Sequence, residues 1–171
     1  MMQKVAKFYK VSFEQFAAGW QDAFGTSVEQ TVYDALKLPV RATAGSAGYD
    51  FFSPLTFSLA PGETIKIPTG IRAEIAEGWV LQCYPRSGLG FKYRLQLNNT
   101  VGIIDSDYFF SDNEGHIFVK LTNDTKEDKT VELAEGAGFA QGIFLPFGIP
   151  ADDDCPEVRN GGFGSTDSKK N

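Results

Sequence analysis

Residues 63–75 read ETIKIPTGIRAEI, and this stretch decides the fold class. Apolar and polar residues alternate on both sides of a Pro-Thr-Gly break, which is the period of half-buried strands. From residue 37 onward, similar short β-rich runs recur between turn signals such as PG, EG, SG and EGAG. Many short strands at this spacing predict an all-β barrel or sandwich of the jelly-roll kind.

Residues 12–24, SFEQFAAGWQDAF, predict a helix ahead of these strands. Apolar residues recur at helical period, at Phe13, Phe16, Ala17, Trp20 and Phe24. Ser12 is placed to cap the helix, with Gln15 at the capping-box position, and Gly25 to end it. We favour a helix packed on the body of the domain. A helix that binds a partner is the alternative.

Composition bounds the function classes. The 171 residues suit one domain, and a net charge of −6 argues against non-specific nucleic-acid binding, which needs a basic face. A small anionic ligand held by local arginines is still compatible with this charge. No signal peptide and no membrane span is evident, so a cytoplasmic protein with no membrane partner is expected.

The cysteine and histidine counts are low. Cys83 and Cys155 lack CxxC spacing, so free thiols are expected, with one disulfide as the alternative. His116 is the only histidine, and a structural role in a loop is favoured over a metal cluster or a Ser-His-Asp triad. The chemistry would therefore use carboxylate, hydroxyl, amide and arginine groups.

Five stretches carry polar groups that suit a phosphorylated ligand. They are TAGSAGYDFF (43–52), YPRSGLGFK (84–92), NNTVGIIDSDYFF (98–110), AGFAQGIF (137–144) and RNGGFGSTDSKK (159–170). A cation and a hydroxyl share the turn of the second, and a carboxylate beside an apolar run in the third suits a general base. The glycines of the last suit a phosphate cradle. Each stretch taken alone is equally an ordinary turn, strand or loose tail.

Taken together, the identity, order and spacing of these stretches resemble the five motifs of the homotrimeric dUTPase family. The resemblance covers roughly residues 36–167 and implies a dUTPase-like β-clip, a distorted jelly-roll barrel. It divides the chain into an N-terminal helical extension (1–35), a β-barrel core (36–150) and a linker with a flexible glycine-rich arm (151–171).

The resemblance also implies an activity, the hydrolysis of dUTP to dUMP and pyrophosphate, which limits uracil in DNA and supplies dUMP. Asp105 would activate a water for in-line attack on the α-phosphate. Asn99 and the backbone at Gly102 would read the uracil edge, and Tyr108 would lie under the deoxyribose. Mg²⁺ is expected on the triphosphate oxygens, mostly through water, so no direct protein ligand is assigned.

The remaining motif residues are implied to hold phosphates. Arg86, Ser87, Gly88 and Gln141 would bind the phosphate chain, with Asp50 positioning the site. The glycine-rich arm would close over a neighbouring subunit, where Phe163 stacks on uracil. Distal phosphates would be held by arm residues, namely Arg159, Gly164, Ser165 and Thr166. Such sharing implies a homotrimer with active sites at subunit interfaces.

The sequence also departs from the family pattern. Only Asn160 separates Arg159 from Gly161, and Gly138-Phe139 stands where a charged pair is common. An insert, FFSDNEGHI (109–117), follows Tyr108. One alternative is a dCTP deaminase of the same fold, with Glu114 as the sole candidate for its catalytic glutamate. The other is a nucleotide-sensing regulatory trimer that uses the insert and the N-terminal helix to bind a partner.

Overall fold

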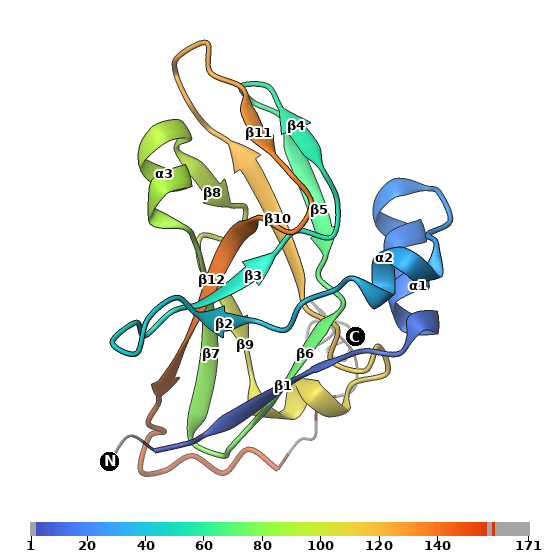
Figure 1. Cartoon of the computed structure of the whole chain (residues 1–171). Helices are drawn as coiled ribbons and strands as arrows, with labels where there is room; N and C mark the ends of the chain where they lie inside the picture. The colour runs from blue at the N-terminus through green and yellow to red at the C-terminus, as the bar shows by residue number, and fades with distance from the viewer. Residues whose placement is uncertain (1–2, 157–158, 160–171) are drawn as a thin grey trace, which may run out of the picture.

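The computed structural model describes residues 3–156 and Arg159, and most of its elements are short strands (Figure 1). The strands are β1 (Ala6–Lys10), β2 (Val40–Arg41), β3 (Tyr49–Phe52), β4 (Phe57–Leu59), β5 (Thr64–Pro68), β6 (Ile71–Ile75), β7 (Trp79–Pro85), β8 (Leu95–Leu97), β9 (Gly102–Ile104), β10 (Phe118–Asn123), β11 (Val131–Leu133) and β12 (Gly138–Pro146). The helices are α1 (Phe13–Phe24), α2 (Gln30–Asp34), α3 (Ser87–Tyr93) and the 3₁₀ turn η1 (Ser106–Phe110).

These strands form four antiparallel sheets. The largest has the order β2-β3-β12-β7-β9, a second has the order β5-β10-β8, and two pairs, β1-β6 and β4-β11, complete the set. Side chains from the two larger sheets meet in one core, where Phe51, Leu81, Leu121 and Phe139 are at most 1% exposed. The alternating pattern of the strands places these residues on the inner face.

The prediction of an all-β fold is confirmed. The stretch 63–75 forms β5 and β6, which break between Pro68 and Ile71 as the sequence predicted. Gly70 occupies this break with a φ of 71°, and a Cβ there would lie 2.3 Å from Leu36. Only glycine suits that conformation and that space. Within the described residues the sheets do not join into one closed barrel, and the arrangement is consistent with a jelly-roll-like β-clip.

The N-terminal helix is confirmed as α1, which packs on the body of the domain beside α2 (Figure 1). Ser12 caps it by accepting the Gln15 N–H, and Gly25 ends it at a φ of 69°. Gln15 does not complete a capping box, because a distant side chain, Glu114, accepts the Ser12 N–H instead. Phe16 is fully buried against Trp20 and Tyr33.

The extension is not purely helical, because it begins with a strand that the sequence analysis did not predict. β1 pairs along its whole length with β6, from Ala6 opposite Ile75 to Lys10 opposite Ile71. Phe8 contacts Phe51, which belongs to the main core. Residues 6–10 are thus part of the β body, and α1 and α2 pack beside it.

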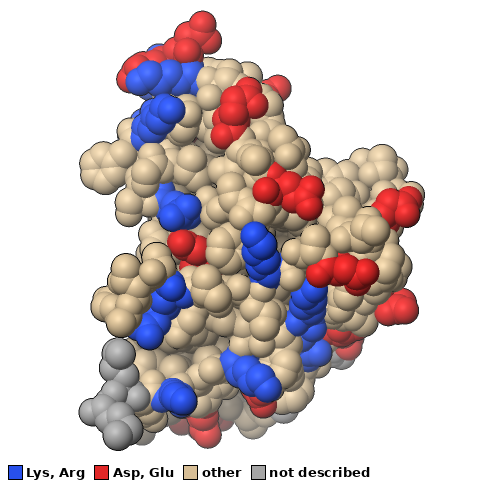
Figure 2. All heavy atoms as spheres, viewed as in Figure 1, with Lys and Arg blue, Asp and Glu red and all other residues tan. Residues whose placement is uncertain are grey.

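The surface has mixed charge. On the face drawn in Figure 2, Lys and Arg side chains lie interspersed with Asp and Glu. Among the described residues, no helix is both long enough and apolar enough to cross a membrane.

Candidate functional site

The residues predicted to bind the phosphate chain, Arg86, Ser87, Gly88 and Gln141, gather around one hollow where β7 ends and α3 begins, called the phosphate hollow after this prediction. This hollow of about 750 Å³ is lined by residues of four elements or the turns beside them, among them Asp50, Arg86, Ser87, Gly88 and Gln141. β12 lies between β3 and β7, with Gln141 opposite both Asp50 and Tyr84, which brings motifs distant in sequence side by side. α3 begins at Ser87, directly after Arg86.

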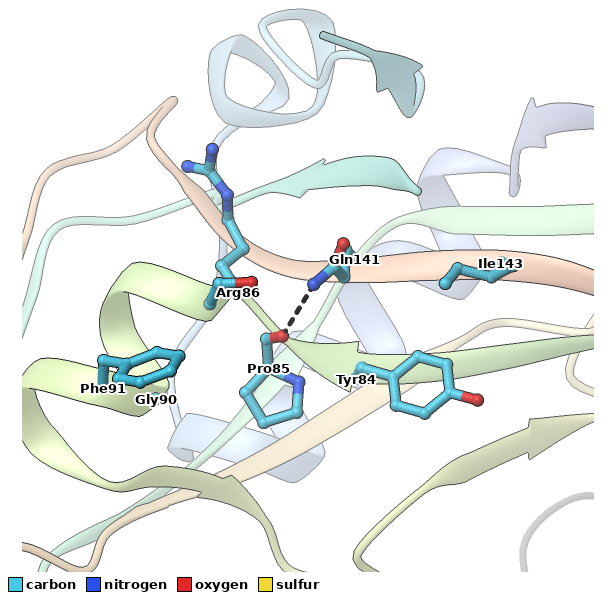
Figure 3. A pocket seen from close by; sticks show the side chains of 8 residues that line it. Tyr84, Pro85, Arg86, Gly90, Phe91, Gln141 and Ile143 are labelled. Atoms are coloured by element: carbon cyan, nitrogen blue, oxygen red, sulfur yellow. Dashed lines mark hydrogen bonds between the residues drawn. The ribbon is translucent and has the colours of Figure 1, made fainter. Parts of the chain in front are cut away.

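Two contacts hold the Arg86 guanidinium over this hollow, and a hydrogen bond from Gln141, drawn in Figure 3, holds the residue before it. Arg86 Nε lies 3.1 Å from the Asp50 carboxylate, and its Nη1 donates to the Gly138 carbonyl at 3.3 Å. Gln141 donates to the carbonyl of Pro85, the residue before Arg86, at 3.0 Å. The guanidinium is thus oriented by neighbours while its side chain stays 42% exposed to a ligand.

Gly138 explains one departure from the family pattern. A Cβ at this position would lie 2.7 Å from Arg86 Nη1, so any side chain would displace the guanidinium. Gly48 is similarly tight, since a Cβ there would lie 2.5 Å from Gln141 Oε1. The sequence analysis noted the Gly138-Phe139 pair but did not identify this close approach, because it depends on a contact across the sheet.

A second cavity, called the β8–β9 cavity, lies at the turn that joins β8, which pairs with β10, to β9, which pairs with β7. Its volume is about 440 Å³, and its wall includes Cys83, Asn99, Gly102 and Ile104. A Cβ on Gly102 would lie 3.1 Å from Cys83 Cβ and 3.9 Å from the Asn99 amide nitrogen. The cavity therefore combines an apolar wall, a side-chain amide and a bare backbone, as a flat heterocycle requires. Burial raises the pKa of Cys83 to about 12, so its thiol is uncharged.

Asp105 lies directly after β9, at the start of η1, and its side chain is 44% exposed. Arg159 of the same chain bridges two carboxylates here. Its Nη2 lies 2.5 Å from Asp105 and its Nε lies 2.9 Å from Asp107. In the described chain this arginine is therefore paired with Asp105, the carboxylate predicted to act as base. The sequence analysis named both residues but did not predict their contact.

The strand register separates Asp105 from the phosphate hollow. Gly102 lies opposite Cys83 and Ile104 opposite Leu81, so the next position, Asp105, falls beside Val80. Arg86 follows the other end of β7. Six residues of extended strand span roughly 20 Å. One chain therefore holds Asp105 and Arg86 at opposite ends of β7, too far apart to act on one phosphate.

Tyr108 is buried, with only 4% of its surface exposed. Its hydroxyl donates to the His116 carbonyl at 2.7 Å and accepts from Asn113 at 2.8 Å. Burial raises its pKa, against the opposing effects of the Asn113 hydrogen bond and of Arg159. In this chain the phenol is thus mainly a support for its own loop.

His116 has the structural role that the sequence analysis favoured. It is fully buried, and its Nε2 accepts the Gly70 N–H at 2.9 Å. Burial lowers its pKa to about 3, an effect that Glu114 opposes and Lys66 reinforces. Both cysteines are free, Cys83 buried and Cys155 exposed.

Glu114, the candidate for a deaminase glutamate, is already engaged. Both of its oxygens accept hydrogen bonds from Ser12. Burial opposes its ionisation, but the two Ser12 donors, Arg72 and His116 outweigh that effect and lower its pKa. Phe163, Gly164, Ser165 and Thr166, predicted to form the arm's contacts, lie outside the described residues.

The carboxylates of the described residues suit a magnesium ion that is carried on the phosphates of a ligand. Among residues 3–156 and Arg159, no three His, Cys, Asp or Glu side chains gather as ligands would. The phosphate hollow does hold one carboxylate, Asp50, beside its cation. Such a site suits an ion carried on ligand phosphates and reached through water, which is how Mg²⁺ commonly binds.

Comparison with known proteins connects this geometry to a family. The sequence profile of dUTPase matches residues 34–167. The deoxyuridine 5'-triphosphate nucleotidohydrolase of Lactococcus lactis subsp. lactis is 45% identical over 134 residues, which cover 77% of this chain and 88% of that protein. The Shewanella baltica protein of the same name is 37% identical over 157 residues, covering 84% of this chain and 99% of its own.

Solved structures agree with these relatives. The dUTPase from Streptococcus mutans superposes with a TM-score of 0.61 at 34% identity, covering 84% of this chain and 97% of its own. The dUTPase from phage phi11 of S. aureus has the same TM-score at 22% identity and covers 91% of this chain and 98% of its own. The second match supports the fold alone.

Proposed function

Since this chain belongs to the dUTPase family, we infer that it is a dUTP diphosphatase, which hydrolyses dUTP to dUMP and pyrophosphate. The observation that carries this inference is the placement of the motif residues. One chain carries both a phosphate hollow, where Arg86 is oriented by Asp50, and a cavity large enough for a heterocycle, where Asn99 supplies an amide. The reaction removes dUTP as a source of uracil in DNA and yields dUMP for dTMP synthesis.

The phosphate hollow would bind the triphosphate. Arg86 supplies a forked cation that Asp50 aims, Ser87 and Gly88 offer a hydroxyl and a backbone N–H, and Gln141 offers an amide. Bound Mg²⁺ would supply further neutralisation of the phosphate oxygens, through water. The protein's own contribution is orientation, because phosphoryl transfer depends mainly on positioning and charge stabilisation.

The β8–β9 cavity would bind uracil and its sugar. The Asn99 amide has a donor and an acceptor, as the edge of uracil does, and the bare backbone of Gly102 permits close approach. Tyr108, a buried residue close to Asp105, would lie under the deoxyribose. A closed wall here would also exclude the methyl group of thymine.

Asp105 would act as the general base. A water held by its carboxylate would lose a proton to it while attacking the α-phosphate in line, and pyrophosphate would leave. For that step Asp105 must exchange Arg159, its partner in this chain, for the water. Arg159 would then be free to bind distal phosphates, and the arm residues Phe163, Gly164, Ser165 and Thr166 would close the site.

We propose that each active site is shared between subunits of a homotrimer. The register that places Asp105 and Arg86 at opposite ends of β7 supports this arrangement. The β8–β9 turn and Asp105 of one subunit would face the phosphate hollow of another, and β12 ends opposite Trp79, so the residues that follow it begin at the Asp105 end of β7. A soluble nucleotide substrate and two free thiols favour the cytoplasm.

Two assays test the proposal. Purified protein with Mg²⁺ should release pyrophosphate from dUTP, while dTTP, dCTP and UTP stay nearly inert. Ammonia released from dCTP would indicate the deaminase instead, and tight binding without turnover would indicate the regulatory trimer.

The second assay tests the sharing of sites. Asp105→Asn and Arg86→Ala subunits, each inactive alone, should regain activity when refolded together, because one mixed interface carries both native residues. No recovery in verified mixed trimers would refute shared sites.

A further inference from the structure

The N-terminal helix is tied directly to the insert that follows Tyr108. The Ser12 N–H donates to Glu114 Oε2 at 2.8 Å, and the Ser12 hydroxyl donates to Oε1 at 2.5 Å. Ser12 in turn accepts the Gln15 N–H at 3.1 Å, so one carboxylate anchors the residue that starts α1. Glu114 adopts a φ of 57°, which a residue other than glycine rarely keeps without tertiary support.

A second contact holds the middle of α1 on the same insert. The helix approaches so closely at Gly19 that a Cβ there would lie 2.8 Å from the His116 ring and 2.9 Å from Phe118. His116 is packed between Phe16 of the helix and Phe118 of β10, with ring centroids 6.3 Å and 4.3 Å away. Helix and insert therefore share one buried surface, and movement of one would displace the other.

The insert is linked to Asp105 by a short chain of hydrogen bonds. The His116 carbonyl accepts the Tyr108 hydroxyl, and Asn113 donates to the same hydroxyl. The Tyr108 N–H donates to the Asp105 carbonyl at 3.2 Å and closes the first turn of η1. Gly115 packs against this turn, because a Cβ there would lie 2.7 Å from the Tyr108 carbonyl. The turn that carries Asp105 is thus fixed from its far end.

We propose that the N-terminal unit (residues 11–34) positions the general base, with Glu114 as the positioning residue that transmits the constraint to Asp105. The inference rests on the proposed function, since it concerns the orientation of the same carboxylate. It assigns a task to two segments, the helix and the insert, that lie outside the five motifs. The Asp105 side chain is 44% exposed and must give up its Arg159 partner for the reaction, so the turn that carries it has to hold its direction.

The direct test is Glu114→Ala, measured as kcat and KM for dUTP in the full-length protein. We expect kcat per active site to fall roughly tenfold to a hundredfold, the cost of a small misplacement of a reacting group. KM should stay within about twofold, because Glu114 lines neither the phosphate hollow nor the β8–β9 cavity. Active sites are counted by titration with a non-hydrolysable imido analogue of dUTP, so that a loss of folded protein is not read as a loss of rate.

A matched control is Glu132→Ala. Glu132 is also a carboxylate that accepts a serine hydroxyl, from Ser58 at 2.8 Å, but it lies on β11, which pairs with β4 in a separate two-stranded sheet. This variant should retain the kcat of the wild type. Glu114→Gln keeps the size of the side chain and one acceptor, so it should lose less than Glu114→Ala and serves if the alanine variant folds poorly.

Amide hydrogen exchange gives a readout that is independent of turnover. The Tyr108 amide should exchange faster in Glu114→Ala than in the wild type or in Glu132→Ala, because the turn loses its distant anchor. Unchanged kcat per titrated site, a KM change as large as the kcat change, or unchanged exchange at Tyr108 would each overturn the proposal. If the wild type failed to hydrolyse dUTP, the proposed function would fail, and the exchange experiment would still decide whether the helix controls this turn.

Discussion

Lowering the pH from 7 to 5 should destabilise this protein through one residue, His116. Its Nε2 accepts the Gly70 N–H, so the neutral ring carries its proton on Nδ1. Protonation would add a second N–H facing the Gly70 donor and would bury a charge. The unfolded chain has no such penalty, so it takes up the proton first.

The magnitude follows from the two pKa values. The pKa of His116 falls from an ordinary 6.5 to about 3 in the folded protein. Above pH 6.5 the His116 ring is neutral in both the folded and the unfolded state, so the free energy of unfolding does not depend on it. Below that pH only the unfolded state is protonated, so stability falls until the folded pKa is reached. With these two pKa values, the difference in proton binding lowers the free energy of unfolding by about 2 kcal/mol between pH 7 and pH 5.

Urea unfolding at pH 7 and pH 5, at one fixed protein concentration, measures this loss. His116→Gln is the matched variant, since it keeps a hydrogen-bond acceptor for Gly70 but does not titrate. It should lose about 2 kcal/mol less than the wild type over the same interval. The pKa values of Glu114 and Asp124 are lowered from ordinary values of 4.5 and 3.8, so their stabilisation is lost only below this window. Equal pH dependence in wild type and variant would refute the reasoning.

Three further predictions concern the site and the thiols. Asp105→Asn should keep affinity for a non-hydrolysable dUTP analogue but lower kcat by roughly 10²–10⁴, measured by pyrophosphate release; unchanged turnover would remove Asp105 as the base. Deleting residues 159–171 should cripple hydrolysis but leave the trimer intact in sedimentation, whereas dissociation would mean that the segment serves assembly. A thiol reagent at pH 8 should label exposed Cys155 and spare buried Cys83, whose pKa is about 12, so that about one thiolate in ten thousand is available; modification of Cys83 detected by mass spectrometry in folded protein would contradict its burial.

Much of the fold was predictable because the signals were local. Alternation over 63–75, the helical period over 12–24 and the caps at Ser12 and Gly25 depend on neighbours within a few residues. Strand β1 was missed because AKFYK is short, and its pairing with β6 lies far away in sequence. The pairing becomes evident only when the partner strand is in place.

The candidate site divides in the same way. The resemblance to the family's motifs implied roles for Asp105, Arg86, Asn99 and Gln141, and those roles are still predictions. The contacts among side chains were not predictable, since Arg159 meets Asp105 across 54 residues and Glu114 meets Ser12 across 102. Gly138 was noted only as a departure, and its reason is the guanidinium that lies against it.

The sequence by itself determined the strand and helix periods, the turns, and the set of polar groups proposed to bind a nucleotide. Tertiary structure alone decided which of them meet. It placed Asp105 and Arg86 at opposite ends of β7. It also brought Glu114 of the insert to Ser12, the residue that caps the N-terminal helix. The physical reason is that propensity and capping act over a few residues, whereas ion pairs and close packing depend on distances that only the assembled sheets set.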